Sequence, residues 1–477
     1  MTQFAALWMF FLICVCVSRI WLDAVKGRFD LVCLRNIYLL GFIIFQLISA
    51  ALTFLTDNYM PYPLSNPSTV GLYYCVLSTG FLTIFLLSYS HPLKLNRLVR
   101  FVPRTAGVPS GGKLLSLAIL ATVTAFALKY GIRIPLVGIL ATYVGNAMGA
   151  AAAVVIGWYW APRFLNPTVA IPSVVLLLAN AAVAVQGSSS RRDIIAVFAG
   201  FIWGVYFSRV RFMRPSTYLP TLAVVSAVGI VVVASFTSVR GSGAKDRARS
   251  PIEHLQAMVT GTDLVKGLLD LGAGQQAAGI SMWIIDKHPE VYPFRGPASL
   301  KYVYEIPIPR SMWLEKPNPL SIEIPKMARI RGVGYGEFNV GPGVIGQSYS
   351  DFGAPAVFLY AILFGLLLRF ADDLVWRSPR DIFVISAVGS GLGQVLAMPR
   401  GDISLFTFVF LVGFIGTYAC MLIFAKVLRL EADPGLLPQA EQSSGFNGMN
   451  GSGEVFEESR LTPDTDGYRN YAELETA

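Results

Sequence analysis

Residues 405–424 read LFTFVFLVGFIGTYACMLIF, a run without a single charged side chain. An α-helix needs about 20 mostly apolar residues to cross the hydrocarbon core of a bilayer, so this stretch has the length and composition of a transmembrane helix. Comparable runs occur at 352–368 and around 221–235. Of the 477 residues, 54% are hydrophobic and 14% are charged, against about 25% charged in ordinary soluble domains. The sequence therefore predicts an all-α, polytopic membrane protein.

Hydropathy and segment length predict about eleven transmembrane helices. The first apolar run has no basic residue before it and no small-residue cleavage pattern after it, so we expect a retained span rather than a cleaved signal peptide. The expected centres of the spans, in chain order, are Phe11, Phe45, Leu77, Ala121, Gly149, Leu177, Gly200, Val228, Tyr360, Gly389 and Gly413.

The distribution of lysine and arginine predicts the orientation of these spans. One alternate set of short loops carries most of the cations, whereas the opposite set holds only Lys129, Arg133, Arg191, Arg192 and Arg400. Because positively charged loops tend to stay in the cytoplasm, the C-terminus is expected inside and the N-terminus outside. In a bacterial inner membrane the second set of loops would then face the periplasm.

The predicted spans and polar regions divide the chain into four parts. Residues 1–237 are expected to form N-terminal transmembrane helices, 238–350 one large periplasmic loop, and 351–430 C-terminal transmembrane helices. Residues 431–477 are acidic and rich in Gly, Ser, Asn and Pro, and they lack apolar periodicity. This composition is typical of a disordered tail, here on the cytoplasmic side.

The large loop is expected to be partly helical and partly irregular. Apolar spacing predicts a helix over 252–269 and a second, short helix within QQAAGISMWIIDKHPE at 275–290. From Val291 onward prolines and glycines crowd together, as in IPIPRSMWLEKPNPL at 306–320, so we expect no regular helix there. The same stretch is rich in aromatic and β-branched residues, which favours an ordered loop over a binding cleft.

Cations on the periplasmic side run against the insertion bias and are therefore candidate ligand contacts. Arg191 and Arg192 stand at the expected N-terminus of the seventh span, where free N–H groups and the helix dipole favour an anion. Arg400 lies in a tight turn between the last two spans, and Arg310 and Lys316 lie in the large loop. Guanidinium groups bind phosphate in a bidentate manner, so this set predicts a diphosphate site. Alternatively, these charges are solvated or contact lipid headgroups.

Aromatic residues of the loop also have two interpretations. Trp313, Tyr304 and Tyr335 are candidates for stacking against sugar rings. Alternatively, Trp313, Tyr302 and Tyr304 belong to the aromatic belt of the membrane interface. The glycines around Tyr335 lack a strand–turn–helix context and a Walker lysine, so no nucleotide site is expected. The five cysteines and three histidines are too scattered for a disulfide framework or a metal cluster. The sequence predicts no metal, no cofactor and no nucleic-acid partner.

Several of these motifs resemble the bacterial O-antigen polymerase family, the polymerases of oligosaccharide repeat units. The similarity lies in PRSMWLEKP at 309–317, in the glycine-rich run that follows, and in GQSYSDFGAPAVFLYAILFG at 346–365. SSSRRD at 188–193 and PRGD at 399–402 are similar to arginine positions of that family. The likeness in organisation covers residues 1–430, and the acidic tail lies outside it.

The resemblance implies a glycosyltransferase of O-antigen, capsule or exopolysaccharide synthesis that joins repeat units carried on polyprenyl diphosphate. It implies partners of three kinds: the lipid-linked oligosaccharide, membrane lipids and a chain-length regulator. Arg191, Arg192, Arg310, Lys316 and Arg400 would then stabilise the charge that develops on the leaving diphosphate.

The same reaction needs a group that accepts the proton of the attacking hydroxyl. Glu337 and Asp351 are preferred for this role, although either could simply pair with an arginine. The full set of candidates is Glu305, Glu315, Glu323, Glu337, Asp351 and His254.

Two other classes remain open from the sequence. A ligase that passes glycan to a different acceptor would use nearly the same architecture. A transporter or flippase of lipid-linked glycans would more often show internal repeats and helices broken at mid-membrane, and no such repeat is visible.

Overall fold

The computed structural model describes residues 2–25, 30–91, 96–102, 109–132, 134–185, 191–213, 277–329 and 340–430, with single residues and short runs between 220 and 267. This part of the chain is helical and contains no β-strand, which confirms the all-α fold class for it. All of it belongs to one compact unit, Met1–Glu431. The span expected near Val228 and the helix expected over 252–269 lie largely outside the described residues. The tail, 431–477, lies wholly outside them.

Within the described residues, nine helical segments are long and apolar enough to cross a membrane. Each contains one of the predicted centres. The centre at Gly200 falls in a further helix, α9 (Arg191–Ser208), whose first residues are Arg191, Arg192 and Asp193. The chain is thus a multi-pass helical membrane protein. The nine segments are Thr2–Asp23, Leu34–Thr56, Pro67–Ser90, Gly111–Gly131, Val137–Arg163, Pro167–Ala184, Ala354–Arg377, Ile382–Arg400 and Ile403–Val427.

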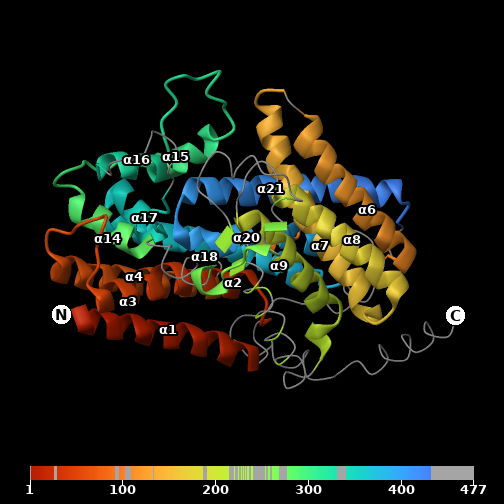
Figure 1. The fold of residues 1–477 in the computed structure, drawn as a ribbon, viewed down its shortest axis with the longest axis horizontal. Helices are drawn as coiled ribbons and strands as arrows, with labels where there is room; N and C mark the ends of the chain where they lie inside the picture. The colour runs from red at the N-terminus through yellow and green to blue at the C-terminus, as the bar shows by residue number, and fades with distance from the viewer. Residues whose placement is uncertain are drawn as a thin grey trace. The chain divides into compact units, whose positions relative to one another are not determined.

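One group of helices is built around α4 (Pro67–Ser90) and α18 (Ala354–Arg377), which pack along each other (Figure 1). Against them lie α1 (Thr2–Val25) and the span made of α2 (Leu34–Phe42), the π-helical turn η1 (Ile43–Ile48) and α3 (Ser49–Thr56). Stacked rings fill the space between them: the centroids of Phe42 and Phe81 are 5.5 Å apart, and those of Tyr38 and Phe85 are 4.6 Å apart.

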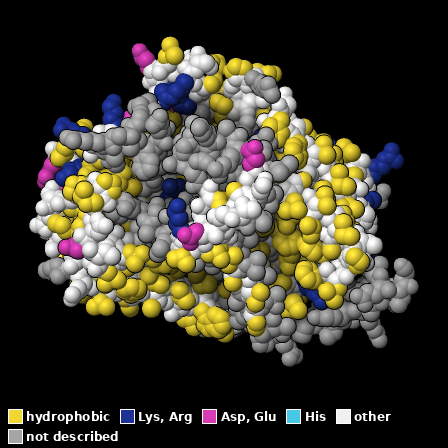
Figure 2. Space-filling model, viewed as in Figure 1, with side chains coloured by type: hydrophobic (Ala, Val, Ile, Leu, Met, Phe, Trp, Pro, Cys, Tyr) yellow, Lys and Arg dark blue, Asp and Glu magenta, His cyan; other side chains and the backbone are white. Residues whose placement is uncertain are grey.

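The second group surrounds α7 (Val137–Trp160), which contacts α6, α8, α9, α19 and α21. Small residues let α7 and α9 approach closely: a Cβ on Gly204 would lie 2.0 Å from the carbonyl oxygen of Val154. Figure 2 shows hydrophobic side chains over much of the surface formed by α6, α7 and α8, as expected of helices that face lipid. The bounds are α5 (Asn96–Val99), α6 (Gly111–Phe126), η2 (Ala127–Gly131), η3 (Ala161–Arg163), α8 (Pro167–Val185), η4 (Val210–Phe212), α19 (Ile382–Gly389), α20 (Leu392–Ala397), η5 (Met398–Arg400) and α21 (Ile403–Val427).

Four shorter helices lie together at one end of the bundle, which we call the α14–α17 end (Figure 1). They are α14 (Ala277–Lys287), α15 (Ala298–Glu305), α16 (Leu320–Met327) and α17 (Val344–Phe352). α14 is the short helix predicted within 275–290. Ile284 of α14 shares a small hydrophobic core with Leu320 and Ile324 of α16, while α15 packs against α21.

The expectation of no regular helix after Val291 was wrong, because α15 and α16 lie in that stretch. Pro297 and Pro319 occupy the N-cap positions of these helices, where a missing N–H group costs no helical hydrogen bond. Pro325 lies inside α16 and leaves the carbonyl oxygen of Ser321 without its helical donor. That oxygen accepts a hydrogen bond from the backbone N–H of Val340 instead, at 3.1 Å.

Candidate functional site

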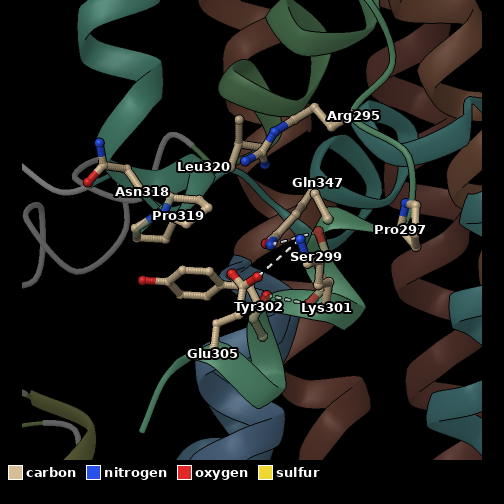
Figure 3. A pocket seen from close by; sticks show the side chains of 13 residues that line it. Arg295, Pro297, Ser299, Lys301, Tyr302, Glu305, Asn318, Pro319, Leu320 and Gln347 are labelled. Carbon is tan, nitrogen blue, oxygen red and sulfur yellow. Dashed lines mark hydrogen bonds and ion pairs between the residues drawn. The ribbon is translucent and has the colours of Figure 1, made fainter. Parts of the chain in front are cut away.

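A cavity of about 310 Å³ lies at the α14–α17 end, within the range of about 300–1,000 Å³ that is usual for small-molecule sites. Its walls come from α15, from the chain at 317–320, from α17 and from the first turn of α21 (Figure 3). Its lining is rich in groups that can hydrogen-bond to a polar ligand. The polar lining residues are Arg295, Ser299, Lys301, Tyr302, Glu305, Asn318, Gln347 and Ser404.

Hydrogen bonds through Ser299 and Gln347 join three of these walls. Gln347 on α17 donates to Ser299 Oγ on α15 at 3.2 Å, and its Oε1 accepts from the backbone N–H of Ile403 at 2.8 Å. Ser404 on α21 donates to the carbonyl oxygen of Ser299 at 2.6 Å. α15, α17 and α21 are therefore held in one arrangement around the cavity.

Asp351, one of the two preferred bases, is fully buried behind this wall. Its carboxylate accepts hydrogen bonds from Ser299 Oγ at 3.1 Å, from the Ser299 N–H at 3.3 Å and from the Tyr360 hydroxyl at 2.7 Å. Burial raises the pKa of Asp351, and the bonds from Tyr360 and Ser299 offset part of that rise. Asp351 does not line the cavity. Its carboxylate instead accepts the backbone N–H of Ser299 and thereby stabilises the first turn of α15.

Replacing Asp351 with alanine is expected to destabilise the protein. Three buried donors, two on Ser299 and one on Tyr360, would lose their acceptor, and each unsatisfied buried group costs about 1–3 kcal/mol. The thermal unfolding midpoint of the detergent-solubilised protein measures the effect. Replacing the exposed Glu315 with alanine is the control and should leave the midpoint unchanged. An unchanged midpoint for D351A would contradict the capping role.

Glu305, at the end of α15, differs from Asp351 in facing the cavity (Figure 3). Its side chain is 10% exposed, and its buried Oε1 accepts no hydrogen bond. The nearest cation is Lys301, whose Nζ lies 3.4 Å from Oε1 and whose side chain is 71% exposed. Glu323 also pairs with a cation, Arg295, at 3.4 Å, but it does not line the cavity. Among the carboxylates that the structure describes, Glu305 is the one that lines the cavity, and so it is best placed there to accept a proton from a ligand.

The two predicted cations of the loop, Arg310 and Lys316, do not line the cavity; Arg310 contacts the lining residues Pro317 and Asn318 from outside it. Arg310 donates to the carbonyl oxygen of Lys316 at 3.0 Å and to the side-chain oxygen of Asn318. Lys316 is buried, donates to the carbonyl oxygens of Ile306 and Ile308 at 3.1 and 2.9 Å, and lies 5.4 Å from the centre of the Tyr302 ring. Burial lowers the pKa of Lys316, and the Arg310 charge lowers it further. These N–H groups hold the loop in shape.

Asp402 is buried, and the charges of Arg192 and Arg400 both act on its carboxyl. Burial raises the pKa of the Asp402 carboxyl, and the charges of both arginines act in the opposite direction. Asp402 accepts hydrogen bonds from Ser321 Oγ at 3.0 Å and from the Leu405 N–H at 3.3 Å, which caps α21. Ser321 follows Leu320 in the sequence, and Leu405 follows Ser404; both Leu320 and Ser404 line the cavity. Asp402 and its two donors therefore adjoin the cavity.

Arg192 keeps part of its donor capacity available. Its side chain is 24% exposed, and its Nε is buried without a hydrogen-bond partner. The guanidinium lies 5.1 Å from the centre of the Phe406 ring, and Nε lies 3.8 Å from Asp193 Oδ1. Asp193 has other donors, Asn146 at 3.3 Å and Gln394 at 3.5 Å. Arg192 is thus suited to bind an added anion.

The turn that carries Arg400 is fixed by glycine. Gly401 has φ +102°, and a Cβ there would lie 2.5 Å from the backbone nitrogen of Gly343. The Gly343 N–H donates to the carbonyl oxygen of Arg400 at 2.7 Å, and Gln46 donates to that of Pro399 at 2.6 Å. The tight turn expected at PRGD is therefore present, and it is locked by two other segments of the chain.

Some of the predicted site residues cannot be placed beside the cavity. Trp313 is half-buried and Tyr304 is 81% exposed, and neither lines the cavity. Glu337, Tyr335 and His254 lie outside the described residues, as does the side chain of Arg191.

Sequence reasoning did not single out Asp402, Arg295, Lys301 or Gln347, and it did not prefer Glu305. Asp402 belongs to the PRGD motif at 399–402, but only the arginine of this motif was considered as a site residue. The other three sit in unremarkable local contexts.

Comparisons with known proteins add no relative: the chain matches no family model, no curated protein and no solved structure.

Proposed function

We propose that this protein is a glycosyltransferase that polymerises oligosaccharide repeat units carried on polyprenyl diphosphate. In this proposal the protein lies in the bacterial inner membrane, with its N-terminus and the α14–α17 end on the periplasmic side and its C-terminus in the cytoplasm. The product is an O-antigen, a capsule or an exopolysaccharide. The large loop, 238–350, would then cover the site at which two lipid-linked ligands meet.

The reaction transfers the growing glycan from its lipid to a hydroxyl of the incoming unit. A bond forms between that hydroxyl oxygen and the anomeric carbon, and the bond from that carbon to the lipid diphosphate breaks. The electron pair leaves with the diphosphate, whose charge Arg192 and Arg400 would stabilise. The hydroxyl proton goes to a carboxylate, for which we propose Glu305.

The observation that carries the proposal is the pairing of two unlike sites at the α14–α17 end. A polar cavity lined by the carboxylate of Glu305 adjoins Asp402, whose carboxyl is influenced by the charges of Arg192 and Arg400. The charges of Asp402, Arg310 and Glu305 all influence Tyr302, whose pKa burial raises to about 12. A sugar-sized polar site next to an anion site suits a substrate that is half glycan and half diphosphate.

The test is an assay of the purified protein in proteoliposomes. Polyprenyl-diphosphate-linked single repeat units, isolated from the source strain after deletion of this gene, serve as substrate, and products are separated by size. We expect a ladder with the spacing of one repeat unit.

Two other results would overturn the proposal. Transfer of a single unit to an added lipid core, without a ladder, would identify a ligase. Absence of any transfer, with movement of the lipid-linked unit across the bilayer, would favour a transporter.

A further inference from the structure

The chain between α15 and α16 ends in a tip, residues 311–315, that exposes large apolar side chains. Met312 is 65% exposed and Leu314 is 85% exposed. Tyr304, on the preceding helix, is 81% exposed. Trp313 lies between the two aliphatic residues and is half-buried. Such a grouping is unusual on a surface that faces only water.

The segment that carries this tip begins, at Ile306, at the level of the membrane spans. Ile306 packs against Phe408 and Val409 of α21. α21 begins at Ile403, so these two residues lie about 7–9 Å along its axis at 1.5 Å per residue. Leu140 and Tyr143, from the first two turns of α7, pack against the same cluster. The chain therefore leaves the bundle beside the ends of two spans, rather than far above them.

From there the tip projects sideways. In Figure 1 the chain between α15 and α16 stands off across the direction of α4 and α21, instead of continuing along it. A segment that leaves the ends of the spans in this direction lies over the surrounding lipid.

Two backbone N–H groups of the tip have partners within the loop. The N–H groups of Met312 and Trp313 both donate to the carbonyl oxygen of Pro309, at 3.0 and 3.2 Å, and the Lys316 N–H donates to that of Trp313 at 3.2 Å. Arg310 satisfies the carbonyl oxygen of Lys316 at 3.0 Å. Buried backbone groups need such internal partners, because lipid offers none.

We propose that residues 312–314 of the tip insert into the lipid leaflet that borders the α14–α17 end, with the charged Glu315 outside the acyl-chain region. Met312 and Leu314 enter the acyl-chain boundary, and Trp313 lies at the headgroup level, where its ring is favoured. Because Arg310, next to the tip, donates to Asn318 of the cavity lining, insertion holds the cavity at the membrane surface. The partner of this surface is lipid, and the inference does not depend on the reaction proposed above.

An environment-sensitive fluorophore on single introduced cysteines tests the inference. Leu314→Cys and Met312→Cys carry the probe at the tip, and Glu290→Cys, in an exposed polar turn after α14, is the matched control. Cys14, which is exposed, is replaced by alanine in every variant. The labelled full-length protein is placed in nanodiscs, with nitroxide-bearing acyl chains as one quencher and iodide in the buffer as the other.

At an insertion depth of about 5–10 Å, we expect nitroxide lipid to quench both tip probes at least about twofold more than the control probe. Iodide should show the reverse order. If the tip probes match the Glu290 probe with both quenchers, the tip is in water and the proposal fails. That second result would leave the surface open to a glycan or a protein instead.

Discussion

Replacing Glu305 with glutamine is expected to lower the rate of polymerisation about 10²- to 10⁴-fold, the usual contribution of a general base. Glutamine keeps the size of the side chain and can still accept a hydrogen bond, but it cannot take up the proton of an attacking hydroxyl. The amount of folded protein should hardly change. The ion pair with Lys301 that is lost involves a side chain that is 71% exposed, and such pairs contribute little to stability. Initial rates in the proteoliposome ladder assay measure the effect.

Two controls separate the carboxylate from its surroundings. Lys301→Gln removes the ion pair and leaves the carboxylate, so it should retain most of the activity. Glu323→Gln removes another carboxylate near the cavity, one that already pairs with Arg295, and should also retain activity. If K301Q loses as much activity as E305Q, the loss is due to the broken ion pair and not to the absence of a proton acceptor. Full activity of E305Q would exclude Glu305 from proton transfer.

The helical architecture could be read from the sequence because it depends on local composition. Every span needs its own uninterrupted apolar run, as at 405–424, and these runs are visible without any knowledge of the partners. The short helices α15 and α16 were missed for the opposite reason. Prolines were read as helix breakers, although Pro297 and Pro319 stand at N-caps and the oxygen freed by Pro325 finds a donor in Val340. That donor is remote in the sequence.

The sequence predicted which types of residue form the candidate site. It predicted less well which role each residue has. SSRRD and PRGD led to Arg192 and Arg400, whose charges both act on the carboxyl of Asp402. Nothing local separates Glu305 from Asp351, however. What separates them is that Ser299 and Tyr360 engage the carboxylate of Asp351, whereas Oε1 of Glu305 accepts no hydrogen bond.

The same limit applies to Arg310 and Lys316. Their charge is evident in the sequence, but the carbonyl oxygens that they bind are set by the turn geometry of 306–318. Substituting them would disturb the cavity wall as well as the charge. Arg192 is therefore the better residue with which to test diphosphate binding.

Replacing Arg192 with alanine is expected to lower the rate of polymerisation about 10²- to 10³-fold, the usual loss when one donor to developing transition-state charge is removed. Lysine at this position should recover little, because it cannot present the two-pronged donor geometry of a guanidinium. The structure should tolerate the change, since Asp193 keeps Asn146 and Gln394 as donors.

Arg209 provides the matched control for Arg192, because it follows the opposite end of α9 and donates to the carbonyl oxygen of Ala161 at 3.1 Å. Arg209→Ala should leave the ladder intact at equal protein level. Added guanidinium ion should partly restore R192A and should have no effect on E305Q, because only the first variant lacks a cation. A full ladder from R192A would remove Arg192 from the anion site. Equal losses in R192A and R209A would assign the effect to the packing of α9, because one end of this helix adjoins the cavity cluster and the other does not.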